Sequence, residues 1–355
     1  MSETAAAPAS RSLARAREIA DDVLFPAALE VDRADRVPPS HLDLLAAEGF
    51  YGLAAPEDLA TLDLPDYPAV FQAVAELAGG CLTTAFVWVQ HHGAVMALGE
   101  TANDALRADH LPDLVAGRRR AGLAVGAAVR PGPPLVRAER ADGGWLFDGE
   151  APWVTGWGMV DTLYAAGRDA DDVIVWALLD AEQRAGLSAG PVLDLVAVQA
   201  SRTVTLRFDR HFVPDGRVLG TVPQREHLKG DAESVRFTGA LSLGLAERAT
   251  GLLRGDAGAL PDELDEVRAR LLSVEPEQVP EARAAAAELA LRAASACAVA
   301  HGSRSVLLQE HAQRLVREAT FLLLFGSRPG IRTALLDRLT HPAQGLSRKD
   351  RGDAP

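Results

Sequence analysis

Cysteine and positive charge are both scarce in this chain of 355 residues. Its two cysteines, Cys81 and Cys297, lie far apart in apolar surroundings. We therefore expect neither a disulfide framework nor a zinc site, and a reducing compartment is indicated. Lysine and arginine total 36 against 49 aspartates and glutamates, a formal net charge of −13. Because nucleic-acid-binding proteins normally carry a basic surface, no nucleic-acid partner is expected.

Long apolar runs are also missing. No uninterrupted run reaches the roughly 18 residues that a membrane helix needs. The first eight residues are small and polar, without the apolar core of a signal peptide. The sequence predicts a soluble cytoplasmic protein with no membrane partner.

The composition is that of a globular protein, with 48% hydrophobic and 24% charged residues. Helical periodicity prevails over residues 1–118, after a polar lead of about ten residues. Short apolar bursts separated by glycine and proline fill residues 119–220. Helical patterns return over 221–345, interrupted by an expected linker with Pro261, Pro276 and Pro280 around the polar segment 262–270, and a tail follows at 346–355. The pattern predicts a mainly α protein with a central β domain of antiparallel strands. The clearest strand places Val204, Leu206 and Phe208 on one face.

A stretch in the middle of the chain, residues 148–161, does not fit a helix. Gly149, Pro152, Gly156 and Gly158 interrupt any helical period. Between them, the segment Trp153-Val154-Thr155 offers an aromatic face, a backbone edge and a hydroxyl group. These groups suit a planar ligand.

Five phrases of the chain, in this order, resemble the acyl-CoA dehydrogenase family. They are Gly49-Phe-Tyr-Gly-Leu-Ala-Ala-Pro-Glu57, the helix from Val70 to Ala85, the stretch Asp148 to Asp161 with its Trp153-Val154-Thr155-Gly156, the segment Ser201 to Pro214, and Gly239-Ala-Leu-Ser-Leu-Gly-Leu-Ala246. The resemblance implies a helical N-terminal domain, a β-barrel-like middle domain and a C-terminal four-helix bundle. It also implies a homodimer or homotetramer formed through that bundle.

The resemblance further implies an oxidoreductase acting on the CH–CH group of an acyl thioester, or another small apolar substrate. The cofactor would be FAD rather than FMN, with Trp153, Val154 and Thr155 beside the flavin ring. A typical member takes the pro-R α-proton with a carboxylate while a β-hydride leaves to the flavin.

The phosphate-binding parts of the cofactor site depart from the family pattern. Where a typical member has Leu-Thr-Glu-Pro followed by Gly-Ser-Asp, this chain has Ala128-Val129-Arg130-Pro131 and then Gly132-Pro133-Pro134. Val129 therefore replaces a hydroxyl donor. The bundle residues that reach the adenylate half have no match over residues 255–280. Because two phosphates need donors or positive charge, these changes should weaken FAD binding.

The usual catalytic glutamate is also replaced. Alignment on the family pattern places Phe325 at that position, with Gly326 and Ser327 kept behind it. Some members carry the base at the start of the small-residue helix, where this chain has Ser234 and, beside it, Glu233. Glu233 is a candidate base, with an exposed carboxylate favoured by the helix dipole as the alternative.

Two neighbouring histidines, His91 and His92, fall in a helix expected over 82–98 that is apolar nearly all round. In the family fold this helix borders the substrate cavity, where a neutral imidazole acts as base or donor. The simpler interpretation is one core histidine bonded to a backbone carbonyl and one facing solvent. No further ligand stands at metal-binding spacing, so no metal site is expected.

Three functions remain open at this point. The first is an acyl-CoA dehydrogenase-like flavoenzyme with an altered base. The second is a flavin-dependent monooxygenase-like member, in which no α-proton base is needed and a pocket histidine assists. The third is a catalytically degenerate subunit that forms a hetero-oligomer with an intact paralogue.

Overall fold

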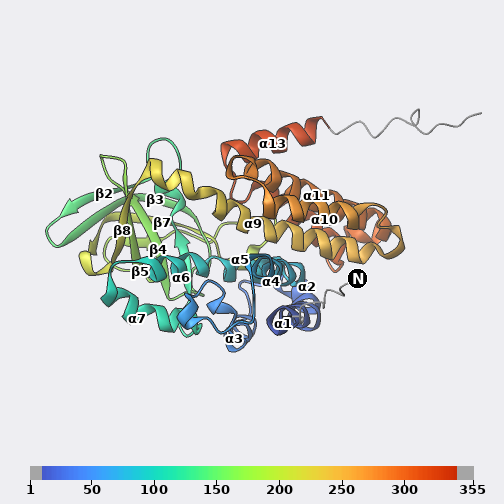
Figure 1. Cartoon of the computed structure of the whole chain (residues 1–355), viewed down its shortest axis with the longest axis horizontal. Coiled ribbons are helices and arrows are strands. Elements are labelled where there is room, and N and C mark those ends of the chain that lie inside the picture. Colours follow the sequence, from blue (N-terminus) through green and yellow to red (C-terminus); the bar gives the residue numbers. More distant parts are fainter. Residues whose placement is uncertain (1–9, 342–355) are drawn as a thin grey trace, which may run out of the picture.

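The computed structural model describes residues 10–341 as helices, then a sheet, then helices. The expected fold class is confirmed. Figure 1 shows the sheet at one end of the molecule and the C-terminal helices at the other, with the N-terminal helices along one side. The first nine residues of the predicted lead and the predicted tail at 346–355 lie outside the described residues.

The N-terminal part is helical, and one predicted helix is split in two. Its α-helices are α1 (Arg11–Ile19), α2 (Phe25–Val31), α3 (Pro39–Ala47), α4 (Tyr67–Gly80), α5 (Leu82–Val89), α6 (His91–Glu100) and α7 (Asp104–Val115). The single helix expected over 82–98 was wrong, because it breaks at Gln90. The Gln90 side chain donates a hydrogen bond to the Phe86 carbonyl, and the Gln90 backbone N–H donates to the Trp88 carbonyl. A side chain that bonds the i−4 carbonyl competes with the helical ladder.

The central sheet has eight strands among the described residues, in the order β6-β7-β3-β2-β4-β5-β8, with β1 paired to β4. Their bounds are β1 (Ala121–Ala124), β2 (Val136–Ala141), β3 (Gly144–Val154), β4 (Thr162–Arg168), β5 (Val173–Asp180), β6 (Leu187–Ala189), β7 (Val204–Pro214) and β8 (Val218–Pro223). Most pairs are antiparallel as expected, but β1–β4 and β2–β4 are parallel. The alternation predicted for β7 is confirmed, since Val204, Leu206 and Phe208 are all buried.

The C-terminal part consists of α9 (Gln224–Leu253), α10 (Leu260–Ser273), α11 (Val279–His301), α12 (His311–Leu324) and α13 (Pro329–Thr340). We expected a linker around 262–270, and α10 corrects that expectation. Pro261 lies in its first turn, where proline is tolerated, and Asp262 and Glu263 follow at the positive end of the helix dipole. These residues favour the helix that they seemed to interrupt.

Glycines let α4 and α9 approach closely. A Cβ atom at Gly79 would lie 2.8 Å from the Gly244 carbonyl oxygen, and one at Gly244 would collide with the Ala75 carbonyl. The two helices therefore pack backbone to backbone, and the N-terminal and C-terminal helices meet along this seam.

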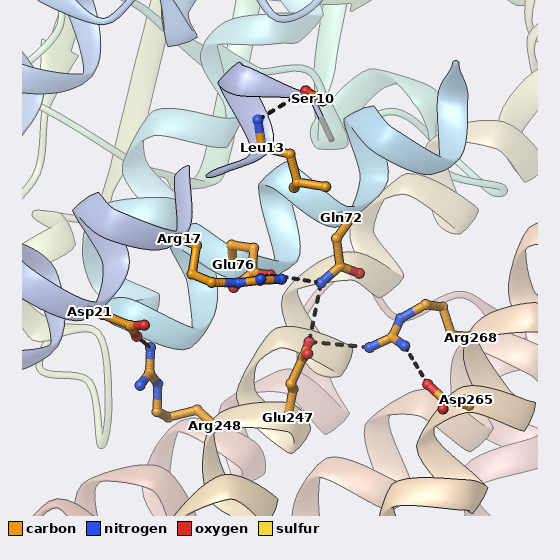
Figure 2. Close-up of polar contacts among 10 residues, drawn as sticks. All are labelled: Ser10, Leu13, Arg17, Asp21, Gln72, Glu76, Glu247, Arg248, Asp265 and Arg268. Carbon is orange, nitrogen blue, oxygen red and sulfur yellow. Dashed lines mark hydrogen bonds and ion pairs between the residues drawn. The ribbon is translucent and has the colours of Figure 1, made fainter. Parts of the chain in front are cut away.

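A polar network flanks the same seam (Figure 2). Glu76 accepts hydrogen bonds from Arg17 at 2.7 Å and from Gln72 at 3.1 Å. Gln72 also reaches Glu247, which pairs with Arg268 at 3.2 Å. The network connects α1, α4, α9 and α10 across the seam.

Candidate functional site

The turn at the end of β3 places Trp153 in an unusual conformation. Trp153 has a φ of +66°, and 58% of the residue is exposed. The pairing of β3 with β7 is irregular between Ala151 and Val154, and Val154 is buried. A bulky residue at positive φ is a rare and costly conformation that clusters at functional sites. The turn therefore exposes an indole at the cost of backbone strain.

A second strained turn packs against the first. Val198 has a φ of +54° and Arg202 a φ of +49°. The Gly156 N–H donates to the Ser201 carbonyl at 2.9 Å, and the Arg202 Nε donates to the Trp157 carbonyl at 3.0 Å. Three strained residues thus lie in two turns that are hydrogen-bonded to each other.

A chain of three hydroxyl groups runs between these turns. Thr155 Oγ1 lies 3.2 Å from Thr203 Oγ1, which lies 2.9 Å from Ser201 Oγ. All three residues are buried. The Thr155 hydroxyl, expected beside a flavin, is therefore held from behind by a second hydroxyl.

Helix α5 connects this turn to the loop that begins at Phe325. A Cβ at Gly156 would lie 3.8 Å from a Val87 methyl group, so Val87 faces the turn. The neighbouring Phe86 meets Phe325 edge to face, with 5.0 Å between ring centroids. Phe321 also packs on Phe325, at 5.7 Å. The structure thus places Gly156, next to Thr155, and Phe325 against adjacent residues of one helix.

The loop after Phe325 is anchored to α9. Gly326 adopts a φ of +64°, and the Ser327 N–H reaches back to the Leu324 carbonyl at 3.4 Å. Arg328 then pairs with Asp231, with 2.6 Å between Nε and Oδ2. This ion pair ties the loop after Phe325 to the N-terminal half of α9.

Val129 lies apart from the strained turns. It ends the short helix α8 (Gly126–Val129), and its side chain is buried in an apolar cluster with Ala128 and Ile174. The carbonyls of Val129 and Arg130 accept hydrogen bonds from the Gln224 side chain, at 3.3 and 2.7 Å. The backbone of this segment offers carbonyl oxygens, and its charged donor is the exposed side chain of Arg130.

Glu233 lies on the surface, in the interior of α9. Its side chain is 66% exposed and pairs with Arg236 at 3.2 Å. Arg236 in turn donates to the carbonyls of Leu271 and Val274, at the end of α10. Because α9 begins at Gln224, Glu233 is too far along the helix for the expected dipole effect.

His91 and His92 are both buried, but in the described part of the chain only His91 has hydrogen-bond partners. His91 Nε2 donates to the Leu114 carbonyl at 3.1 Å, and its Nδ1 accepts from the Ala121 N–H at 3.0 Å. These two bonds define a neutral tautomer, and burial lowers the pKa of His91 to about 3. His91 thus matches the simpler interpretation, whereas the expectation that the other histidine faces solvent was wrong.

His92 is enclosed by rings. It meets Trp88 at 4.7 Å and His91 at 5.5 Å, both edge to face. Neither ring nitrogen has a hydrogen-bond partner among the described residues, and burial lowers the pKa of this imidazole well below its ordinary value. An unsatisfied buried imidazole is uncommon and calls for an explanation.

These residues fit one half of the expected cofactor. Trp153, Val154 and Thr155 provide an indole, a backbone edge and a hydroxyl for a flavin ring. The segment at Val129 lacks the hydroxyl donor of the family pattern and carries Arg130 beside that position. Within residues 10–341, no cluster of three or more histidine, cysteine or acidic side chains is placed to hold a metal, and no helix is long and apolar enough to cross a membrane.

Sequence reasoning missed Ser201 and Thr203 as part of the site. Both stand in the phrase Ser201–Pro214 that carries the family resemblance, so the phrase itself was the available signal. The strain at Val198 and Arg202 had no such signal, because neither residue type favours positive φ.

Known proteins resemble this chain in sequence and in fold. Residues 10–118 match the family model for the acyl-CoA dehydrogenase N-terminal domain. Benzylmalonyl-CoA dehydrogenase of Aromatoleum aromaticum is 26% identical over 241 residues, covering 64% of this chain and 62% of the relative. 3-Sulfinopropanoyl-CoA desulfinase of Variovorax paradoxus is 25% identical, covering 72% and 65%. The chain spans about half to two thirds of the length of the curated relatives it matches.

Solved structures share the whole fold. A glutaryl-CoA dehydrogenase in complex with glutaryl-CoA has a TM-score of 0.80 at 17% identity, covering 93% of this chain and 94% of the other. The nitrososynthase of Micromonospora carbonacea var. africana has a TM-score of 0.76 at 20% identity, covering 96% and 98%. At these identities the likeness establishes the fold and leaves the reaction open.

Proposed function

Since the chain belongs to the acyl-CoA dehydrogenase family, we propose that it is a flavin-dependent oxidoreductase acting on an acyl thioester. The observation that carries this proposal is the strained conformation of Trp153, which exposes its indole two residues before the hydrogen-bonded Thr155 hydroxyl. Such strain persists only where the surrounding structure enforces it, and it is typical of binding sites.

In this proposal each residue of the turn has its own role. Trp153 covers one face of the ring, Val154 offers its backbone edge, and the Thr155 hydroxyl donates a hydrogen bond. The flavin, when bound, supplies the acceptor for the β-hydride of the acyl group. FAD is the expected form, with weakened affinity because Val129 replaces a hydroxyl donor. Gly326 and Ser327 border the acyl side behind Phe325.

The proton acceptor is the part of the proposed site that departs from the family pattern. A general base must reach its proton within hydrogen-bonding distance, and the Phe325 ring has no proton-accepting atom. Glu233 is engaged by Arg236, and both nitrogens of His91 are occupied. His92 alone among the candidate bases is buried with both nitrogens free of partners in the described structure. We therefore rank His92 first among the three.

The same histidine supports a second candidate, a flavin-dependent monooxygenase. A neutral imidazole whose two nitrogens lack partners is able to accept a proton or to donate one. Such a reaction needs no α-proton base, so an aromatic residue at position 325 is compatible with it. The nitrososynthase that shares the fold over 96% of this chain shows how broadly the scaffold is used.

We also propose that the chain forms a homodimer or homotetramer. An open groove of about 560 Å³ lies on α11 and α12, and its rim carries Val299 and Val306, 80% and 79% exposed. Leu308 nearby is 61% exposed. Exposed apolar residues that gather in this way mark protein contacts. Light scattering after size exclusion would give the mass, and co-purification with a paralogue would indicate the hetero-oligomer instead.

The visible spectrum of the purified protein, alone and titrated with FAD or FMN, tests the main proposal. We expect bound flavin with perturbed absorption bands. Anaerobic bleaching by acyl-CoAs would then support the dehydrogenase, and oxygen-dependent product from externally reduced flavin would support the monooxygenase. Absence of flavin binding in every titration would rule out both enzymes for the isolated chain.

A further inference from the structure

The three hydroxyl groups between the two strained turns raise the question of which one donates and which one accepts in each hydrogen bond. Thr155, Thr203 and Ser201 are 4%, 2% and 0% exposed, so water has little access to any of them. Thr203 lies between the other two, within hydrogen-bonding distance of both. Three hydroxyl protons are present, but only two hydrogen bonds join the three oxygens. One proton must therefore be donated outside the chain or be left without an acceptor.

The cost of a buried, unsatisfied donor decides which proton is left over. Within the described residues, Ser201 Oγ has Thr203 as its only partner. If Thr155 donated to Thr203, either Thr203 or Ser201 would hold a buried proton with no acceptor, at a cost of about 1–3 kcal/mol. If instead Ser201 donates to Thr203 and Thr203 donates to Thr155, both inner protons are satisfied. The proton left over is then that of Thr155, which is also buried, at 4% exposed, and which an acceptor atom on a bound ligand would satisfy.

The backbone of the two turns holds this chain in place. The Ser201 carbonyl accepts the Gly156 N–H, directly after Thr155, and the Thr203 carbonyl accepts the Leu193 N–H, both at 2.9 Å. Ser201 follows Val198 and precedes Arg202, the two strained residues of the second turn. The second turn is thus a support for the hydroxyl of the first.

We propose that Ser201 and Thr203 are positioning residues that make Thr155 an obligatory hydrogen-bond donor. The ligand atom facing Thr155 must then be an acceptor, such as an unprotonated ring nitrogen or a carbonyl oxygen of a planar heterocycle. This inference rests on the proposed flavin site, because an acceptor atom on the bound ligand is what satisfies the Thr155 proton.

The test is a double-mutant cycle on flavin binding. Thr203→Val keeps the shape of the side chain and removes the relay, whereas Thr203→Ser keeps the hydroxyl. We expect Thr203→Val to weaken flavin binding roughly three- to tenfold and to shift the flavin absorption bands as Thr155→Val does. The double variant should then add little, because both changes remove one coupled interaction. Ser201→Ala should give a smaller shift in the same sense.

Controls separate positioning from a general effect on the fold. Thr205→Val, the same substitution two residues further on, removes a half-buried hydroxyl outside the chain and should change neither affinity nor spectrum. Thr203→Ser should restore both. Wild-type affinity and spectrum in Thr203→Val, or fully additive effects in the double variant, would overturn the proposal.

A second measurement does not depend on flavin. In protein labelled at serine and threonine, NMR should find slowly exchanging hydroxyl protons on Ser201 and Thr203 and a faster one on Thr155. If wild-type protein binds no flavin, the proposed function fails while this measurement still decides the direction of the chain. A protected Thr155 proton together with a rapidly exchanging Ser201 proton would overturn the inference.

Discussion

Hydrogen-bonded polar residues lie on one side of helix α5, and aromatic residues lie on the other. Toward the sheet, Thr155 is hydrogen-bonded to Thr203, and His91, just beyond the helix, bonds the backbone of β1. Toward α12, Phe86 meets Phe321 and Phe325 in a purely aromatic contact. The residues toward the sheet are hydrogen-bonded, whereas the contact around Phe325 is apolar. Under the proposed function, this contrast means that the flavin-facing groups are kept without the usual proton acceptor.

The largest expected effect compares the two histidines beside α5. His91→Phe removes the partners of the Leu114 carbonyl and the Ala121 N–H, and leaving both unsatisfied should lower the free energy of unfolding by about 2–4 kcal/mol. His92→Phe replaces a ring whose nitrogens bond nothing in the described structure, so its stability should change little or increase. Urea unfolding measures the free energy of unfolding of both variants. Equal losses in the two variants would contradict the distinction between them.

The aromatic side is tested by Phe325→Glu. A carboxylate between Phe86 and Phe321 should cost about 2 kcal/mol, since burial of a polar group without a partner is unfavourable. In flavin-loaded protein the same change should raise acyl-CoA dehydrogenase activity if this position faces the substrate. Phe325→Gln is the matched control, because it has similar shape and polarity but cannot take the proton. No gain over Phe325→Gln with any acyl-CoA would remove support for the alignment.

The pH dependence of stability tests whether the fold holds His91 and His92 neutral. Burial lowers the pKa of His91 to about 3 and that of His92 well below its ordinary value. Both are neutral in the folded and unfolded chain above pH 6.5, but below it the unfolded chain takes up protons that the fold excludes. Stability should therefore fall as the pH drops from about 6.5 toward 3, by up to about 1.4 kcal/mol per pH unit for each histidine.

Unfolding midpoints at pH 7.0 and 5.5 measure this slope while most carboxylates stay ionised. His91→Phe should reduce the slope by up to one histidine's share. An unchanged slope in that variant would show that His91 is not held neutral by the fold.

The smallest effect concerns the strained turn. Trp153→Asn places a residue that tolerates positive φ at a largely exposed position, so stability should stay level or rise by less than about 1 kcal/mol. Flavin binding should nevertheless weaken at least tenfold, because the indole face is gone. Thermal unfolding and flavin titration of the same sample compare the two. A loss of stability with unchanged binding would indicate that Trp153 supports the fold rather than the ligand.

The sequence predicted the fold well where residue periodicity and burial agree. Val204, Leu206 and Phe208 alternate in β7 as expected and are buried. It failed at α10, where Pro261 was taken for an interruption although proline suits a first turn. It also failed at Gln90, whose side chain competes with the backbone for the Phe86 carbonyl.

The candidate site was less predictable than the fold. Trp153 and Thr155 stood out because glycines isolate them in the sequence. The break at Gln90 separates α5 from α6 just before the histidines, so the period of one long helix could not show that His92 is buried with His91. Nothing in the residue types of Val198 and Arg202 indicates positive φ, which is imposed by tertiary contacts.

The long helix α9 joins the sheet to the N-terminal helices. Its 30 residues span about 45 Å. At its sheet end the Gln224 side chain donates to the carbonyls of Val129 and Arg130. Further along, Gly244 packs against the Ala75 carbonyl of α4. One continuous helix therefore sets the distance between the Val129 segment and the seam with α4.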